Sequence, residues 1–265
     1  MAEEYSYRAQ AAAGYDDAFS HVSKYFVPFL LSAARIGSGE NVLDVASGTG
    51  IAAEAALAIV GTSGSVVAAD ISPDMVAKAR KRLGQMPNAS VAVEDGQALS
   101  FRDETFDVVL CSTGLMFFPD PARGVSEFRR VLGAGGRAAV SVAAASPSLS
   151  YNGRINVALA RYVPRFAEVN DRYFAIGEAA RLVSLFEDAG FVNVETHTQR
   201  HTFTLPSFDA YYGPYERGAG STGQALASLS DEVRHAVREE VRRDLNDTGS
   251  SVEVEVELRI ASGQR

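Results

Sequence analysis

Residues Val42 to Gly50 read VLDVASGTG, and the ten residues after them read IAAEAALAIV. The apolar start predicts a β-strand, the glycines a tight turn, and the alanine-rich run a helix that ends at Gly61. A strand that leads through glycines into a helix is typical of α/β folds that bind a nucleotide-like ligand. Read alone, Gly48, Gly50 and Ala53 fit the G-x-G-x-x-A form of a dinucleotide fingerprint. Asp44 does not belong to that fingerprint, so this stretch alone leaves the ligand open.

The chain around this stretch alternates between strands and helices as far as residue 143. Ser72-Pro73 supplies a helix cap and a first-turn proline, and Gly133 to Gly136 predicts a turn. Strands are expected at 41–46, 65–70, 90–94, 106–111 and 137–143, and helices at 51–60, 73–83 and 120–132. The alternation predicts an α/β fold: a doubly wound, Rossmann-like, mostly parallel seven-stranded sheet with an antiparallel C-terminal strand, plus helical cap elements.

The second half of the chain is less regular. Helices are expected at 153–177, 178–189 and 231–245, and the composition of 213–223 predicts a flexible loop. Strict alternation in SVEVEVELRIA, 251–261, implies one solvent-exposed face, which an inner strand of a doubly wound sheet should lack. An antiparallel ribbon that pairs 192–203 with 251–261 and projects past the helical layers would resolve this conflict.

Composition limits the class of protein. The chain has 265 residues, 46% hydrophobic and 22% charged, with a formal net charge of −8 and a pI near 5.1. This acidity disfavours a nucleic-acid partner, which requires a basic face. The polar N-terminus MAEEYSYRAQ does not resemble a secretory signal, and no apolar run approaches the ~20 residues that span a bilayer. With Cys111 as the single cysteine, we expect a cytoplasmic protein that has no membrane partner.

Two further carboxylates follow predicted strands. Asp70 ends the second strand, where a carboxylate can accept both hydroxyls of a ribose. Asp95 lies in Glu94-Asp95-Gly96-Gln97 after the third strand, where an acid can accept a hydrogen bond from an adenine amino group. Ligands of doubly wound folds bind at the carboxyl ends of the strands, so these acids are expected at the same edge as Gly48.

With these pieces, the sequence resembles the class I S-adenosylmethionine-dependent methyltransferases, in the small-molecule branch close to the ubiquinone/menaquinone methyltransferases. Five stretches in order carry the resemblance over roughly residues 40–142: VLDVASGTG, VVAADISPDMVAKAR, VEDGQALSF, FDVVLCSTGLMFFPDP and EFRRVLGAGGRAAVS. Two positions depart from the family pattern. Ala46 stands where the family often has glycine, and Ala134 where proline is common.

The resemblance implies a site for S-adenosyl-L-methionine and no metal. The loop after the first strand would surround the methionine part through Asp44, Ala46, Ser47, Gly48 and Gly50. Asp70 would hold the ribose, and Asp95 would bind the adenine amino group. Their neighbours Ile71, Met75, Gly96 and Gln97 would lie beside the adenine. The passage to the sulfonium would be lined by Cys111, Ser112 and Leu115. Cys111 has an alternative interpretation as a small buried hydrophobic residue.

The residues outside the core are interpreted by their position. Tyr7 and Tyr15 are expected to close over the cofactor, as N-terminal segments do in similar enzymes. The acceptor-binding candidates are aromatic or apolar: Met116, Tyr151, Tyr173, Tyr211 and Tyr212. No catalytic base is assigned, because the four histidines His21, His197, His201 and His235 fall on an apolar stripe or on polar surfaces.

These observations predict a single methyltransferase domain over residues 1–265. Its core is expected at about 38–145, 178–204 and 250–262, and its cap elements at about 1–37, 146–177 and 205–249. The function implied is methyl transfer from S-adenosyl-L-methionine to an O, N or C nucleophile of a small-molecule acceptor, with a homodimer as a possible assembly. Two alternatives stay open: a cofactor-binding but non-methylating enzyme, such as a cyclase, and an NAD-dependent oxidoreductase.

Overall fold

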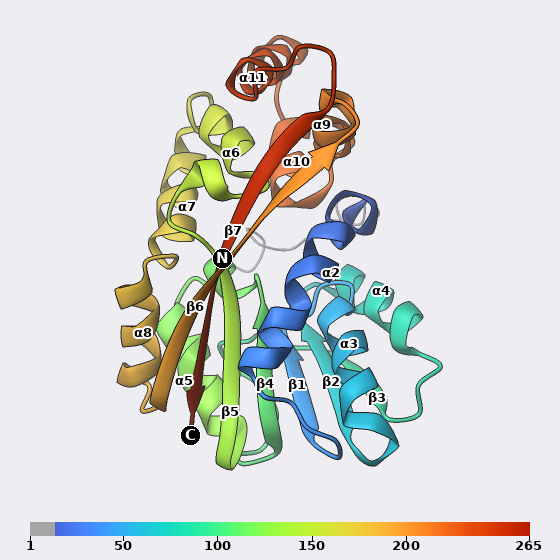
Figure 1. Ribbon diagram of the computed structural model, residues 1–265, viewed down its shortest axis with the longest axis vertical. Coiled ribbons are helices and arrows are strands. Elements are labelled where there is room, and N and C mark those ends of the chain that lie inside the picture. The colour runs from blue at the N-terminus through green and yellow to red at the C-terminus, as the bar shows by residue number, and fades with distance from the viewer. Residues whose placement is uncertain (1–13) are drawn as a thin grey trace. The chain divides into compact units, whose positions relative to one another are not determined.

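The computed structural model describes residues 14–265, and seven of its strands form one sheet (Figure 1). The strand order is β3-β2-β1-β4-β5-β7-β6. The first five strands are β1 Asn41–Val45, β2 Ser65–Asp70, β3 Ala89–Val93, β4 Phe106–Ser112 and β5 Leu132–Ala143. They pair in parallel throughout. The strand order reverses beside β1, so the carboxyl ends of β1 and β4 form the switch point at which such folds bind ligands.

The helices of this part of the chain are α2 Tyr15–Ala33, α3 Ile51–Val60, α4 Pro73–Leu83, α5 Pro121–Val131 and α8 Ala179–Asp188. One continuous core joins α2, α3 and α4 to the sheet, with Leu30, Val42, Val60, Val66 and Leu110 among its fully buried members. Ser72 caps α4 as expected: its Oγ accepts a hydrogen bond from the Met75 N–H, and Pro73 opens the helix.

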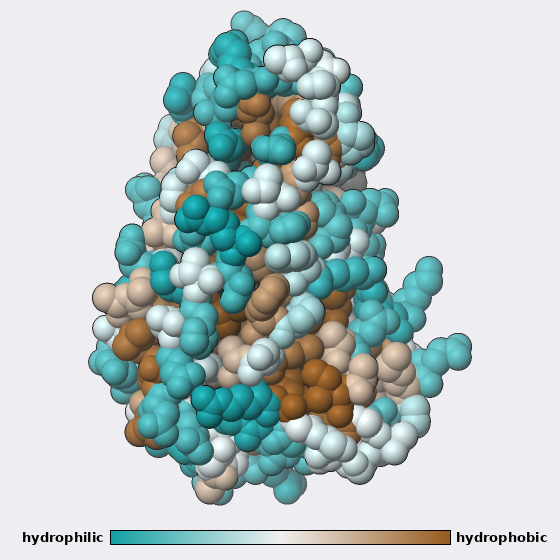
Figure 2. All heavy atoms as spheres, viewed as in Figure 1, coloured by the Kyte–Doolittle hydropathy of each residue, from teal (hydrophilic) through white to brown (hydrophobic). Residues whose placement is uncertain are grey.

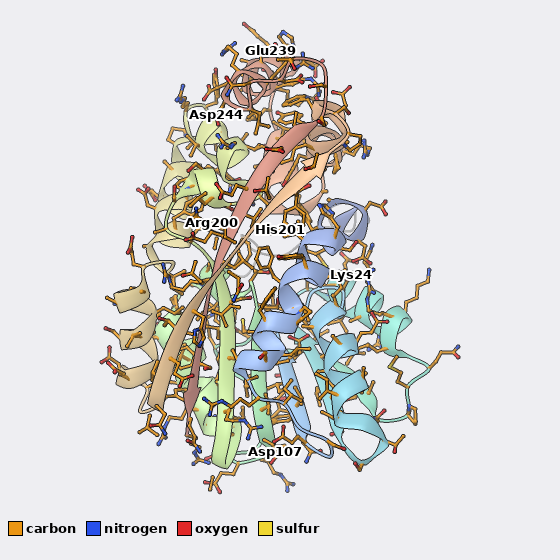
Figure 3. The ribbon with its side chains drawn as sticks, in the orientation of Figure 1. Lys24, Asp107, Arg200, His201, Glu239 and Asp244 are labelled. Atoms are coloured by element: carbon orange, nitrogen blue, oxygen red, sulfur yellow. The ribbon has the colours of Figure 1, made fainter. Side chains whose placement is uncertain are left out.

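The C-terminal strands are β6 Val192–Leu205 and β7 Val252–Gln264. Paired positions run in opposite directions along them: Asn193 bonds to Gln264, while Arg200 bonds to Glu257. β7 is also antiparallel to β5, since the Ala144 N–H donates to Glu257 O and the Arg265 N–H donates to Gly136 O. The predicted antiparallel pairing of 192–203 with 251–261 is therefore confirmed. Figure 3 marks Arg200 on β6, where it ion-pairs with Glu255 and Glu257 of β7.

Two expected loops are wrong. Gly133 to Gly136 lies within β5, where the register to β4 shifts by a bulge between Phe106 and Val108. The stretch 213–223, expected to be a loop, belongs mostly to helices α9 Phe208–Glu216 and α10 Gly220–Ala227. Burial of Tyr211, Tyr212 and Tyr215 outweighs the glycine content there, as tertiary packing commonly overrides helix propensity.

The chain divides into two compact units. One contains His21–Val142, Glu178–Gln199 and Arg259–Arg265, and is called the sheet unit here. The other contains the described part of Met1–Ser20 with Ala143–Gly177 and Arg200–Leu258, and is called the helical unit. Besides α9 and α10, the helical unit contains α6 Gly153–Ala160, α7 Pro164–Ala175 and α11 Asp231–Asp244. The strands β6 and β7 run through both units.

The surface is mixed in character. On the face in Figure 2, hydrophilic residues are interspersed with small groups of hydrophobic ones. The exposed large hydrophobic residues come from separate elements and include Ile59, Ile71, Met86, Val93 and Val192. Among the described residues, no helix has the length and apolar character needed to cross a membrane.

Candidate active site

The loop after β1 has an unusual backbone. Ala46, Gly48 and Gly50 all adopt left-handed conformations, with φ of 54°, 54° and 84°. The loop is fixed by hydrogen bonds from the Ser47 N–H to Ala69 O at 3.0 Å and from the Gly50 N–H to Ser47 O at 2.9 Å. A Cβ added at Gly48 would meet no protein atom within 4 Å, whereas one at Gly50 would lie 3.3 Å from the Ala79 Cβ. Gly50 therefore serves helix packing, and Gly48 borders open space.

Asp44 is a buried carboxyl group of the sheet unit that lacks hydrogen-bond partners. Its side chain is fully buried, and neither carboxylate oxygen forms a hydrogen bond. Burial raises the pKa of Asp44 to about 8; the nearby Asp70 charge adds to the rise, while the Ala53 N–H, which falls short of hydrogen-bond geometry, lowers the pKa. The Ser47 hydroxyl is also buried without a partner. Since native buried polar groups are nearly always satisfied, two unpartnered groups at the end of β1 and in the loop after it indicate a binding site for a polar ligand.

Asp70 at the end of β2 is oriented by the backbone. Its Oδ2 accepts from the Gly48 N–H at 2.8 Å and its Oδ1 from the Ser72 N–H at 2.9 Å. Burial raises the pKa of Asp70, and these two N–H donors oppose the rise. Because each carboxylate oxygen can accept more than one hydrogen bond, both remain able to receive ribose hydroxyls.

The turn after β3 carries Asp95, Gly96 and Gln97. The Glu94 N–H donates to Asp70 O at 3.1 Å, which joins this turn to the end of β2. Asp95 is exposed, and its Oδ1 accepts from the Gln97 N–H at 2.9 Å. Gly96 is buried against Phe118 and Val45, where an added Cβ would lie 2.4 Å and 2.8 Å from their side chains.

The segment after β4 approaches the loop after β1 closely. A Cβ on Gly114 would lie 2.5 Å from the Ala46 Cβ and 3.0 Å from the Cys111 Sγ. Gly114 thus provides the space for the methyl group of Ala46, which explains how the chain tolerates alanine where the family often has glycine. Cys111, Leu115 and Met116 are buried, and Ser112 is half-buried. Burial raises the pKa of the Cys111 thiol, and the negative charge of Asp44 adds to it, so this cysteine is protonated at neutral pH.

The structure therefore brings the predicted residues of β1, β2, β3 and β4 to one edge of the sheet. Two of them differ sharply in exposure: Ile71 is 42% exposed, whereas Met75 is 1% exposed and packs inside. Sequence reasoning missed Gly114 and the role of Phe118, which lies between Gly96 and Gly124. Only the clustering of glycines around the FDVVLCSTGLMFF stretch could have indicated them.

The predicted tyrosines belong to the helical unit and are described within it. Tyr211 and Tyr212 are at most 1% exposed, and Tyr151 and Tyr173 are 8% and 7% exposed. The Tyr211 hydroxyl donates to Tyr151 O at 2.7 Å. Tyr151 and Tyr211 form an aromatic cluster with residues that the sequence did not single out, Phe19, Phe203 and Tyr215. Tyr173 packs edge-on against Phe174, and Tyr212 stacks on Phe208. Tyr15 stacks at a tilt on Phe19, with ring centroids 4.9 Å apart, and Tyr7 lies outside the described residues.

The histidines offer no evident base. His21, His197 and His235 are exposed, and partial burial lowers the pKa of His21. His201 packs edge-on against Phe203, with ring centroids 4.6 Å apart; Figure 3 marks it on β6 beside Arg200. Among the described residues, no group of three or more His, Cys, Asp or Glu side chains could hold a metal ion.

Comparisons with known proteins identify the family of this chain. A family model described as "Methyltransferase domain" matches residues 42–136. The chain is 32% identical over 186 residues to the ubiquinone/menaquinone biosynthesis C-methyltransferase UbiE of Cellvibrio japonicus, covering 64% of this chain and 74% of the relative. The crystal structure of a Bacillus halodurans protein described as a methyltransferase is 22% identical, with a TM-score of 0.61 over 90% of this chain and 97% of that one. A Haemonchus contortus phosphoethanolamine N-methyltransferase 2 bound to S-adenosyl-L-methionine is 16% identical, with a TM-score of 0.60 over 98% of this chain and 57% of that one.

The chain belongs to the class I S-adenosylmethionine-dependent methyltransferases. Within this class it falls in the ubiquinone/menaquinone-type branch, and it is a methyltransferase of the small-molecule type. This decides against the dinucleotide interpretation of Gly48 and Gly50. The residues present fit S-adenosyl-L-methionine, because an orphaned buried carboxylate suits a cation and the open space beside Gly48 suits a close backbone approach.

Proposed function

We propose that this enzyme methylates a carbon nucleophile of a small molecule, with the cofactor bound across the carboxyl ends of β1 to β4. The observation that carries the cofactor site is the pair of buried, unpartnered side chains Asp44 and Ser47 beside the open space at Gly48. Bound S-adenosyl-L-methionine supplies an activated methyl group for direct displacement from its sulfonium.

The residues of this chain bind and orient the cofactor. Asp44 and the backbone of residues 46–50 would contact the charged methionine part, and Asp70 would accept hydrogen bonds from the ribose hydroxyls. Asp95 would accept a hydrogen bond from the adenine amino group, and its Oδ1 also accepts one from the Gln97 N–H. The mostly buried segment from Cys111 to Met116 excludes water from the reacting methyl group. This favours transfer, because an enzyme promotes such a displacement mainly by aligning the reactants and excluding water.

Two observations support a carbon acceptor. The Cellvibrio japonicus relative is named as a C-methyltransferase. The segment after β4 presents a protonated thiol and the hydroxyls of Ser112 and Thr113, none of which acts as a base at neutral pH. Methylation of an acidic phenol at a ring carbon starts from its phenolate, joins the methyl to that carbon and then releases the proton of that carbon to water, so no base in this segment is required. The acidity of the chain supports a small molecule over a nucleic acid.

Further properties are proposed on the same basis. The buried tyrosines of the helical unit, Tyr151, Tyr173, Tyr211 and Tyr212, are proposed as candidates for acceptor binding. Met116 is a separate candidate within the sheet unit. The free buried thiol of Cys111 is compatible with a reducing, cytoplasmic location. Neither a nucleic acid nor a membrane is proposed as a partner, and a homodimer is the proposed assembly.

The cofactor site is tested by calorimetric titration with S-adenosylmethionine, its demethylated product and NAD. We expect micromolar binding of the first two and none of NAD, and Asp70→Ala should weaken binding about tenfold or more by removing charged hydrogen bonds. Unchanged affinity in Asp70→Ala would refute its role in ribose binding.

The carbon acceptor is tested by incubating the enzyme with isotopically labelled cofactor and a panel of phenols and naphthols. The position of the label in the product, read by NMR, should be a ring carbon. Label on oxygen or nitrogen would refute carbon methylation. Cofactor binding without transfer to any member of the panel would refute a phenol or naphthol as the acceptor.

A further inference from the structure

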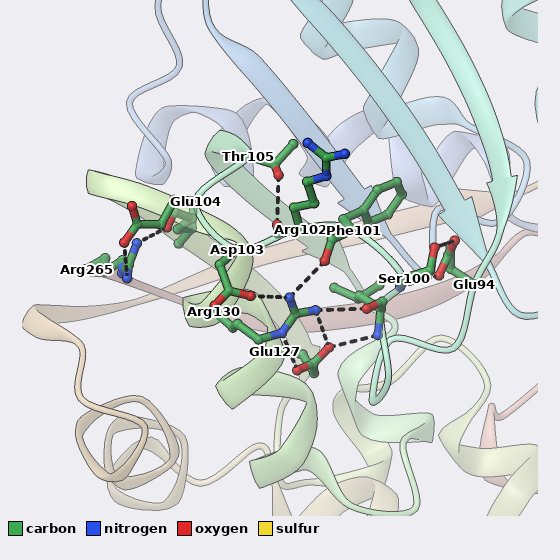
Figure 4. A network of polar contacts seen from close by, with 12 residues as sticks. Glu94, Ser100, Phe101, Arg102, Asp103, Glu104, Thr105, Glu127, Arg130 and Arg265 are labelled. Atoms are coloured by element: carbon green, nitrogen blue, oxygen red, sulfur yellow. Dashed lines mark hydrogen bonds and ion pairs between the residues drawn. The ribbon is translucent and has the colours of Figure 1, made fainter.

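One face of helix α5 holds the segment that follows β3. Arg123, Glu127 and Arg130 recur at helical spacing on that face. Arg130 donates to Leu99 O and Phe101 O, both at 2.8 Å, and ion-pairs with Asp103 and Glu127 (Figure 4). Glu127 Oε2 in turn accepts from the Leu99 N–H at 2.8 Å. The segment therefore takes its position from α5.

Gln97 is the first residue of the segment after β3 that bonds to α5 and its cap. Its side-chain Oε1 accepts from the Asp120 N–H at 2.8 Å, and its backbone carbonyl accepts from Arg123 Nε at 2.7 Å. Its own N–H and Nε2 donate to Asp95 Oδ1, at 2.9 Å and 3.3 Å. Each polar group of Gln97 thus has a partner within the protein, which fixes the side chain against Asp95 and α5.

The Phe118 ring packs between the turn that contains Asp95 and Gly96 and helix α5. Its ring occupies the space that a Cβ at Gly96 would need, 2.4 Å away, and the space that a Cβ at Gly124 of α5 would need, 2.5 Å away. The backbone of the Asp95 turn therefore lies directly on this ring, and the ring lies directly on α5. Small displacements of the turn are opposed on both sides, by packing and by hydrogen bonds.

We propose that Gln97 is a positioning residue that, with Arg123 of α5, sets the preference of the cofactor site for adenine. The bonds to Asp95 Oδ1 fix the carboxylate so that Oδ2 is directed to the 6-amino group. In Gln97→Ala only the backbone N–H of residue 97 still donates to Asp95 Oδ1, and loss of the Nε2 bond leaves the exposed carboxylate free to turn about that one contact. This inference rests on the proposed function in one respect, the role of Asp95 in binding the adenine amino group.

The test compares S-adenosylhomocysteine with S-inosylhomocysteine, in which a carbonyl replaces the 6-amino group and the neighbouring N1 carries a proton. Calorimetric dissociation constants are measured for the unaltered protein and for Gln97→Ala, Arg123→Ala and Asp95→Ala. Gln85→Ala, at an exposed position of the same unit, is the matched control. Arg123 is exposed, so its variant tests the inference even if Gln97→Ala fails to fold.

We expect the unaltered protein and the control to prefer the adenine ligand by about tenfold or more, since a charged hydrogen bond is replaced by a repulsion between two acceptors. In Gln97→Ala and Arg123→Ala, the dissociation constant of the inosine ligand divided by that of the adenine ligand should fall to about threefold or less. Most of this change should come from a lower dissociation constant of the inosine ligand. Equal weakening of both ligands, with the ratio kept, would show a purely structural role and overturn the inference.

The two proposals fail differently. If the unaltered protein shows no preference and Asp95→Ala changes nothing, the assignment of Asp95 to adenine is wrong. If Asp95→Ala removes the preference while the Gln97 and Arg123 variants keep it, only the inference about Gln97 is wrong.

Discussion

Asp44 combines full burial with two unpartnered oxygens, and it therefore carries a proton at neutral pH when no cation is bound. A cationic ligand favours the ionised carboxylate. Below the pKa of about 8, binding of such a ligand must therefore release a proton from Asp44.

Cofactor binding is accordingly expected to strengthen as pH rises from 6 to 8, by up to about tenfold per pH unit. Titration of S-adenosylmethionine at pH 6.5, in two buffers with different ionisation enthalpies, measures the number of protons released. The expected value is close to one in the unaltered protein and close to zero in Asp44→Asn, which cannot titrate. Proton uptake on binding, or the same release in both proteins, would contradict this role for Asp44.

Gly48 and Gly50 form a matched pair in the same loop. Both have positive φ, so alanine at either position costs about 1–2 kcal/mol of left-handed strain. Alanine at Gly50 also crowds Ala79 and Leu83 of α4, at 3.3 Å and 3.4 Å, whereas alanine at Gly48 meets no protein atom.

Gly48→Ala is therefore expected to abolish cofactor binding with a small loss of stability, and Gly50→Ala to lose more stability. Denaturant titration gives the free energy of unfolding for each, and calorimetry gives the cofactor affinity. Wild-type affinity in Gly48→Ala would mean that the ligand does not approach this backbone.

At the scale of elements, α5 contributes to the stability of the fold through the contacts of Arg130. Arg130→Ala removes hydrogen bonds to two carbonyls and two partly exposed ion pairs, and should lower the free energy of unfolding by about 2 kcal/mol. Arg102→Ala, at an exposed position in the same segment, is the control and should change little.

The effect of Arg130→Ala should depend on pH in a defined direction. Hydrogen bonding to Arg130 lowers the pKa of Glu127 below its ordinary 4.5. The stability from this pair is fully present above that value and is lost as pH falls through the lower folded pKa. The difference in unfolding free energy between the two proteins should therefore narrow between pH 7 and pH 3. A constant difference over that range would show that the ion pair contributes nothing.

The elements of the sheet unit could be predicted because the signals for its strands and helices lie in short stretches of sequence. Caps such as Ser72-Pro73 and apolar runs such as 65–70 depend on neighbouring residues only. The bulge that draws Gly133 to Gly136 into β5, and the helices formed by 213–223, depend on partners distant in sequence, so local composition misled there. The same holds in the site: strand-end carboxylates such as Asp70 were predictable, but the use of Gln97 within the protein depends on α5.

At the scale of the whole molecule, the proposed cofactor contacts come from four short segments at the carboxyl ends of β1 to β4. All four, at residues 44–50, 70–72, 95–97 and 111–116, belong to the sheet unit. A cofactor in contact with these segments would add to the bonds that already join the strand ends, such as that from the Gly48 N–H to Asp70. Binding to the folded state alone should stabilise it by mass action.

Saturation with S-adenosylhomocysteine at 100 times its dissociation constant is expected to add about 2.7 kcal/mol, which corresponds to a rise in midpoint temperature of about 5–10 °C. Hydrogen exchange should slow most in the four segments, because local opening there requires loss of the ligand. The exposed end of β6, at residues 192–195, serves as the internal control and should exchange at an unchanged rate. Slower exchange at 192–195 without protection of residues 44–50 would place the ligand elsewhere and refute the site at the end of β1.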